Sequence, residues 1–330
     1  MPKQARKFFG GVFLVIFAVI TLFPALAVAD ELRLKIHGNV VFDQAGRKLA
    51  IDRPYSRIIS LYGAHTENLF RLGLNDSIIG VSRHETFPPG ALEKPVFSYH
   101  DDLEKFLAAR PDLVLIRPMI DRGYARLVKR LEQNGITVVS LQPATVEKMH
   151  TYWSILGALT SRQNRAQKMT AHFRQAVREL KLLTDSMPAK KKVYFEAIHS
   201  KMKTFTPDAM AVFALETAGG INVAQDAKPV RNTNIAYYGK EKILSHGPEI
   251  DVFLAQRGAM NRPSIALIKN EPGFQVIKAV ADNQIYIIDE QIVSRPTFRL
   301  LDGIRAIGRI LYPEVFKENA DEIVQRAKQF

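Results

Sequence analysis

Short apolar runs that alternate with helical patterns constrain the fold of this chain more than any other feature. Seven strand-like runs stand out, at residues 57–61, 78–82, 113–117, 136–141, 192–197, 251–256 and 284–289. Helical patterns lie between many of them, and a closing amphipathic pattern runs from Leu300 to Leu311 before Pro313. Alternation of this kind predicts an α/β fold with parallel sheets.

One helical pattern is much longer than the others. Between Arg162 and Leu183, apolar residues recur three or four positions apart, as at Ala166, Met169 and Leu180, and no turn signal interrupts them. At 1.5 Å per residue, a helix of this length spans roughly 33 Å. We therefore expect a rigid helical connector between two lobes, which would limit how far they open.

The first 29 residues have the pattern of a secretory signal peptide. A basic stretch, an apolar run and a small-residue cleavage site follow one another, at Lys3, Arg6 and Lys7, at residues 8–23, and at Ala27-Val28-Ala29. We expect cleavage after Ala29 and export to the periplasm. The alternative is an uncleaved membrane anchor, for which the apolar run before Pro24 is short.

Composition narrows the class further. The chain has no cysteine, which rules out disulfides, thiolate metal sites and lipid attachment at a cysteine. Its formal net charge is +13, and the leader accounts for three of the basic residues, so the rest of the chain favours anionic partners. We do not expect nucleic acid as a partner, because the chain is predicted to be exported and has no recognisable nucleic-acid-binding motif.

Length and an internal repeat both predict two lobes. Without the leader, 301 of the 330 residues remain, more than most single domains contain. The segment EKFLAARPDL from Glu104 aligns with EKILSHGPEI from Glu241, with Glu-Lys, Leu, Pro and an apolar residue at matching positions. We place an N-terminal lobe at residues 30–160, a connecting helix at 161–187 and a C-terminal lobe at 188–330.

The loops that follow the predicted strands are the expected ligand site. Ligands of open α/β sheets bind outside the carboxyl ends of the strands. Arginine binds carboxylates in bidentate fashion, and tyrosine offers a flat apolar wall. The expected cleft residues are Tyr62, His65, Arg83, His84, Tyr99, His100, Arg117, His199, Arg257 and Arg295. No G-x-S-x-G, H-E-x-x-H or phosphate-binding loop is present, so no enzymatic activity is expected.

Four of the eight histidines fall in these loops, namely His65, His84, His100 and His199. Neutral imidazole is a good ligand for zinc, copper, iron and nickel. The same histidines are equally compatible with hydrogen bonds to an organic ligand or with helix capping. A metal site made of them is therefore one of two open interpretations.

Several longer segments resemble one known family. They are Asp43-Gln-Ala-Gly-Arg47, RIISLYGAHTENLFRLGLNDSIIGVS, LEKFLAARPDLVLI, and AVADNQIYIID followed by RPTFRLLDGIRAIGRILYP. Over nearly all of residues 40–315, the chain resembles the periplasmic substrate-binding proteins of ABC importers for ferric siderophores, haem and cobalamin. The resemblance implies two Rossmann-like α/β lobes joined by a single long helix, with the ligand cleft between the lobes.

The resemblance also implies a function and a partner. Members of the family dock onto the permease through one surface glutamate per lobe, and the matching positions are Glu104 and Glu241. The implied protein is a monomer without a covalent cofactor. It captures an iron chelate or a cobalamin-type metal complex and delivers it to an inner-membrane ABC importer.

The four loop histidines depart from the aromatic and basic residues typical of that family. Binding of a bare or weakly chelated transition metal through His65, His84, His100 and His199 therefore stays open as an alternative. A metal-dependent enzyme on a similar fold is a third and less favoured one.

Overall fold

The computed structural model describes residues 35–185, 187–230 and 233–329. The predicted signal peptide, residues 1–29, and its cleavage after Ala29 lie outside these ranges. No helix in the described residues is both long enough and apolar enough to cross a membrane. The fold is mixed α/β, with two sheet-centred lobes and a long helix that packs against both, as the sequence predicts.

The first lobe is built on a five-stranded parallel sheet. Its strands are β4 (Ile58–Ser60), β5 (Ile78–Ser82), β6 (Val96–Phe97), β7 (Leu113–Ile116) and β8 (Thr137–Ser140). The spatial order is β6-β5-β4-β7-β8, so the chain reverses its direction of travel between β4 and β7. Both central strands are buried throughout, which explains their continuous apolar runs.

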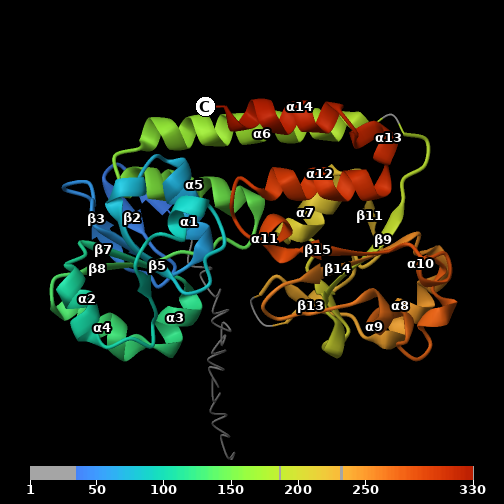
Figure 1. Cartoon of the computed structure of the whole chain (residues 1–330), viewed down its shortest axis with the longest axis horizontal. Helices are drawn as coiled ribbons and strands as arrows, with labels where there is room; N and C mark the ends of the chain where they lie inside the picture. The colour runs from blue at the N-terminus through green and yellow to red at the C-terminus, as the bar shows by residue number, and fades with distance from the viewer. Residues whose placement is uncertain (1–34, 186, 231–232, 330) are drawn as a thin grey trace, which may run out of the picture. The chain divides into compact units, whose positions relative to one another are not determined.

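Helices cover both faces of this sheet. They are α1 (Gly63–Arg71), α2 (Leu103–Ala109), α3 (Pro118–Gly123), α4 (Ala125–Gln133) and α5 (Val146–Leu159). Figure 1 shows α2, α3 and α4 on one side of the strands and α1 and α5 on the other.

A small antiparallel sheet that the sequence analysis missed precedes the five-stranded sheet in the first lobe. It contains β1 (Lys35–His37), β2 (Val40–Phe42) and β3 (Lys48–Ala50). Asp43 in the β2–β3 turn is buried and accepts hydrogen bonds from the backbone N–H groups of Ala45, Arg47 and Ser140. The motif from Asp43 to Arg47 therefore ties this small sheet to the end of β8.

The second lobe is built on a seven-stranded sheet. Its strands are β9 (Lys192–Ile198), β10 (Lys203–Phe205), β11 (Ile221–Asn222), β12 (Lys228–Pro229), β13 (Ile235–Tyr237), β14 (Val252–Arg257) and β15 (Ile285–Asp289). The order is β12-β13-β10-β9-β14-β15, and β11 pairs with β9. Its helices are α7 (Met210–Thr217), α8 (Lys240–Ser245), α9 (Ile265–Lys269), α10 (Lys278–Ala281), α11 (Glu290–Val293), α12 (Leu300–Leu311), α13 (Pro313–Phe316) and α14 (Asn319–Lys328).

This second sheet contains both parallel and antiparallel strands. The expectation that the sheets would be parallel is therefore wrong for this lobe. β9, β11, β14 and β15 pair in parallel, whereas β10 and β13 pair in antiparallel fashion with their neighbours. Only a short turn, with Met202 at a positive φ, separates β9 from β10. A connection that short can join only antiparallel strands.

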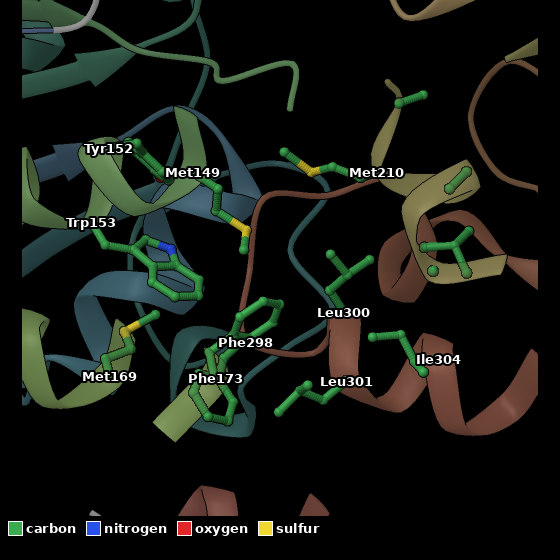
Figure 2. Close-up of a cluster of buried hydrophobic side chains, with 14 of the residues drawn as sticks. Met149, Tyr152, Trp153, Met169, Phe173, Met210, Phe298, Leu300, Leu301 and Ile304 are labelled. Carbon is green, nitrogen blue, oxygen red and sulfur yellow. The ribbon is translucent and has the colours of Figure 1, made fainter. Parts of the chain in front are cut away.

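The long helix predicted from the sequence is α6 (Gln163–Asp185). Figure 1 shows it lying beside α14, with one end near α5 and the other near α12 and α13. Its buried face packs into an apolar cluster that contains residues of both lobes. In Figure 2, Trp153 of α5 and Phe173 of α6 meet Phe298, which leads into α12.

Polar contacts also bridge the two lobes beside this cluster. The carbonyl oxygen of Pro296 accepts hydrogen bonds from Asn68 Nδ2 at 2.9 Å and Trp153 Nε1 at 3.4 Å. Arg299 donates two hydrogen bonds to the carboxylate of Glu67, at 2.8 and 2.5 Å. The segment before α12 is thus fastened to α1 and α5 by directional bonds.

Candidate functional site

A pocket of about 400 Å³ opens where strands of both sheets end. That volume lies in the range of small-molecule sites, about 300–1,000 Å³. From the first lobe it is lined by Leu61, Tyr62, Gly63, Ser82, Arg83, His84, Phe97, Ser98, Tyr99, His100, Arg117 and Gln142. From the second lobe it is lined by Phe205, Asn234, Ile235, Gln256, Ala259, Met260, Glu290, Ser294 and Arg295.

The topology of the first sheet explains why this pocket forms there. The loops that follow β4 and β7 diverge at the point where the strand order reverses, which leaves a crevice between them. Tyr62 follows β4 and Arg117 follows β7, so both side chains reach that crevice. The guanidinium of Arg117 lies 5.2 Å from the ring centroid of Tyr62, a cation–π contact.

Seven of the ten expected cleft residues line the pocket, namely Tyr62, Arg83, His84, Tyr99, His100, Arg117 and Arg295. These seven residues lie at strand ends, where the rule places a ligand site. Their binding of a ligand stays a prediction.

Aromatic rings form one part of the pocket wall. The ring of Tyr99 lies 4.6 Å from the rings of His100 and Tyr124, and His100 and Tyr124 meet edge to face at 5.0 Å. The hydroxyl of Tyr124 is 3.2 Å from His100 Nε2. His100 is therefore held by aromatic neighbours and presents a polar edge beside a flat apolar surface.

The charged residues that line the pocket carry a net positive charge. Arg83, Arg117 and Arg295 face the pocket together with one carboxylate, that of Glu290. Glu290 Oε2 accepts a hydrogen bond from the backbone N–H of Ala259 at 3.1 Å. An anionic group on a ligand would therefore be attracted to this pocket.

Two glycines make room for these charged groups. A Cβ on Gly63 would lie 2.6 Å from Arg295 Nη1 and 3.2 Å from Glu85 Oε2, and a Cβ on Gly258 would overlap Glu290. Glu85 also accepts a hydrogen bond from Ser82 Oγ at 2.5 Å, and burial raises the pKa of its carboxyl. A side chain at either position would therefore displace the end of the Arg295 or the Glu290 side chain.

The structure corrects the placement of His65. It lies on the buried side of α1 and does not line the pocket. Its Nδ1 lies 2.7 Å from the hydroxyl of Tyr152, and its Nε2 lies 3.0 Å from the carbonyl oxygen of Ile116. Burial lowers the pKa of His65 to about 4, so this imidazole is a neutral part of the core.

His199 and Arg257 are also outside the pocket lining. His199 is buried, with Nδ1 2.8 Å from Glu196 Oε2 and with its backbone N–H donating to Asn261 Oδ1 at 3.1 Å. Arg257 is exposed at the end of β14. Its neighbour Gln256 lines the pocket, and successive side chains of a strand point to opposite faces.

The four histidines considered as metal ligands are not brought together. His84 and His100 line the pocket, whereas His65 and His199 are engaged in separate buried contacts. Within the described residues, no group of three or more histidine, aspartate or glutamate side chains is arranged to hold a metal ion. The metal site of all four histidines, which the sequence left open as an alternative, is therefore not formed in the described residues.

The pocket also contains residues that the strand-end rule did not identify. Glu290, Gln142, Asn234 and Gln256 contribute a carboxylate and three amides. Gln142 and Gln256 stand at strand ends that the sequence located, so this rule could have found them. Asn234 precedes β13, one of the short antiparallel strands that left no clear pattern in the sequence.

Glu104 and Glu241 occupy matching positions in the two lobes. Each lies in the first turn of a short helix, α2 or α8, that leads toward a central strand of its sheet. The side chain of Glu104 is 73% exposed and lies 3.4 Å from Arg130 Nη2. Glu241 is also exposed. Both carboxylates are thus accessible to a partner.

Comparison with known proteins identifies the family. The family model described as "Periplasmic binding protein" matches residues 58–292, most of the chain and both lobes. The chain therefore belongs to the periplasmic binding protein family, as the sequence resemblance indicates.

Individual relatives agree with this assignment. The chain is similar to a vitamin B12-binding protein of Vibrio campbellii, with 30% identity over 77% of this chain and 88% of the relative. It is also similar to an uncharacterised ABC transporter substrate-binding lipoprotein of Bacillus subtilis, with 24% identity over 84% of this chain and 86% of the relative.

A solved structure has the same fold. It is that of a possible iron-binding, periplasmic solute-binding protein from Staphylococcus epidermidis, with a TM-score of 0.69 and 26% identity. The match covers 79% of this chain and all of the solved chain. The chain is therefore similar to substrate-binding proteins of transport systems and not to enzymes.

Proposed function

We propose that this chain is the periplasmic binding protein of an inner-membrane ABC importer and that it carries a metal chelate. The cargo is an iron chelate or a cobalamin-type complex, held between the two lobes without covalent chemistry. The relatives named for vitamin B12 and for possible iron binding support this class of ligand.

The pocket lining is the observation that carries the proposal. Rings of Tyr62, Tyr99 and His100 offer flat apolar contact, which suits the organic part of a chelate. Arg83, Arg117 and Arg295 offer bidentate donors, which suit carboxylate or phosphate groups on its periphery. A bare metal ion has no use for three arginines or for a flat apolar surface, so the lining favours a chelate.

Transfer to the importer is proposed to use Glu104 and Glu241. Both are exposed, and both stand at the same point of their lobe, so a permease with two-fold related basic sites could engage them together. Charged residues at the rim of an interface steer association more than they add affinity.

The test is a pair of substitutions, Glu104→Ala with Glu241→Ala, in a strain that depends on this chain for uptake. Uptake at limiting ligand should fall roughly tenfold or more, because the steering charges are lost. The ligand dissociation constant should stay unchanged, because neither residue lines the pocket.

Glu93→Ala with Glu314→Ala is the matched control, since these glutamates are also exposed and lie one in each lobe. This control pair should leave uptake at the wild-type rate. Normal uptake in the Glu104 and Glu241 double variant would refute the docking role, and weakened ligand binding in it would show that the two residues act on the ligand site instead.

A further inference from the structure

Two carboxylates and two guanidinium groups meet beside the ligand pocket, where the lobes touch. Glu67 and Glu85 belong to the first lobe, and Arg295 and Arg299 belong to the segment that leads into α12. Arg299 donates hydrogen bonds of 2.8 and 2.5 Å to Glu67, so this carboxylate is occupied. Arg295 Nη1 stays 3.8 Å from Glu67 Oε1, beyond hydrogen-bond distance. The group therefore pairs Glu67 with Arg299 and leaves Glu85 to Arg295.

Glu85 is placed to interact with Arg295. Its Oε1 accepts a hydrogen bond from Ser82 Oγ at 2.5 Å, which fixes the carboxylate. Its Oε2 has almost no exposed surface and no hydrogen-bond partner in the described part of the chain. A Cβ on Gly63 would lie 3.2 Å from this Oε2 and 2.6 Å from Arg295 Nη1. The bare Cα of Gly63 thus leaves the space across which the two groups face each other.

The carboxylate and the guanidinium attract each other across this space. The Arg295 side chain is only 16% exposed, so water and salt screen the attraction less than at the open surface. Burial raises the pKa of the Glu85 carboxyl, and the hydrogen bond from Ser82 and the charge of Arg295 oppose that rise. The interaction is mutual, so Glu85 in turn reduces the positive potential that Arg295 presents to the pocket.

We propose that Glu85 is a positioning residue that holds the Arg295 guanidinium against α1 and weakens its attraction for an anionic group in the pocket. Arg117, by contrast, lies over the uncharged ring of Tyr62. The arginines of the pocket therefore differ, and Glu85 sets how strongly the pocket selects for negative charge. The inference rests on the proposed function only in that the pocket receives an anionic group.

The test is NMR of the Arg295 guanidinium in protein labelled with ¹³C,¹⁵N-arginine, at about pH 7, with Arg295→Lys protein to assign its signals. In the wild-type protein we expect slow rotation about the Nε–Cζ bond, as a restrained guanidinium shows. Glu85→Gln keeps the side-chain shape but removes the charge, so it should speed this rotation. Glu85→Asp keeps the charge but withdraws it from Arg295, and it should lie between the two.

Inorganic phosphate is the probe for the second effect. It should shift the Arg295 signals at a concentration roughly three- to thirtyfold lower in Glu85→Gln protein than in wild type, because repulsion by the carboxylate is gone. Glu93→Gln is the matched control, since it removes the same charge from an exposed residue of the first lobe that does not line the pocket. The control should behave as wild type.

The outcomes separate this inference from the proposed function. Unchanged rotation in Glu85→Gln protein would overturn the restraint, and an equal gain in Glu93→Gln protein would replace it by a diffuse effect of net charge. Equal phosphate shifts in all proteins without a change in rotation would support an anion-binding pocket and overturn the role of Glu85. Faster rotation without any phosphate shift would support the restraint and contradict the anion-binding part of the proposed function.

Discussion

Buried histidines of this chain respond to pH in opposite directions. Burial lowers the pKa values of His65 and His150 to about 4, so they resist protonation in the folded state. The hydrogen bond to Glu196 raises the pKa of His199 above its usual value. Acidification below about pH 6.5 therefore favours the unfolded chain through His65 and His150, which take up protons only there.

His199 affects the stability of the folded chain at higher pH. Its raised folded-state pKa means that its stabilising contribution is complete below the unfolded pKa of about 6.5. The contribution is lost as pH rises through the folded-state pKa, because the folded chain must then release a proton that the unfolded chain has already lost.

His199→Gln should therefore lower the free energy of unfolding most at about pH 6, by roughly 1–3 kcal/mol, because buried Glu196 loses its charged partner. The difference from wild type should shrink toward about pH 9, as the wild-type imidazole becomes neutral. Urea unfolding across this range measures it. A difference that stays constant or grows with pH would contradict the ion pair.

The same histidines show what could be predicted for single residues. The strand-end rule located the loops and placed Arg117, His84 and His100 correctly on the pocket. It failed for His65 and His199 because it locates a backbone position and not the direction of a side chain. Whether a histidine after a strand faces ligand or core depends on partners such as Tyr152 and Glu196, which lie elsewhere in the sequence.

At the scale of elements, close backbone approach decides how α12 packs. A Cβ on Gly303 would lie 2.1 Å from the carbonyl oxygen of Ile292 in α11. A backbone oxygen cannot rotate away as a side chain can, so α12 lies against α11 only because residue 303 has no side chain.

Gly303→Ala should lower the free energy of unfolding by about 1–3 kcal/mol, in spite of the better helix propensity of alanine. Thermal or urea unfolding measures the change. Gly123→Ala in α3 is the control, because nothing lies within 4 Å of a Cβ there. Its effect should be neutral or stabilising, and an equally stable Gly303→Ala protein would disprove the tight contact.

The elements themselves were predictable where they are long and buried. All seven strand-like runs of the sequence correspond to strands, and β5 has the predicted bounds of residues 78–82. The missed strands β1, β2, β3, β6, β10, β11, β12 and β13 have only two or three residues each. Runs that short have no measurable periodicity, and pairing with distant neighbours rather than local sequence makes them strands.

At the scale of the whole described unit, the two lobes share one apolar core. Trp153 stacks on Phe298, Phe173 meets Phe298 edge to face, and Arg299 is bonded to Glu67 beside them. Separating the lobes far would break these contacts and expose the aromatic cluster of Figure 2 to water. We therefore expect modest closure around a ligand, with α6 as a rigid strut, rather than a wide hinge movement.

Capture of a metal chelate in the pocket is the central claim, and native mass spectrometry with metal analysis tests it most directly. The protein is purified from the cells that produce it and compared with Arg117→Ala protein. We expect a monomer with one bound organic mass carrying iron or cobalt, and a reduced load in the variant, because Arg117 faces the pocket. A stoichiometric metal without an organic mass, lost in His100→Ala protein, would contradict the claim and make the chain a carrier of bare metal.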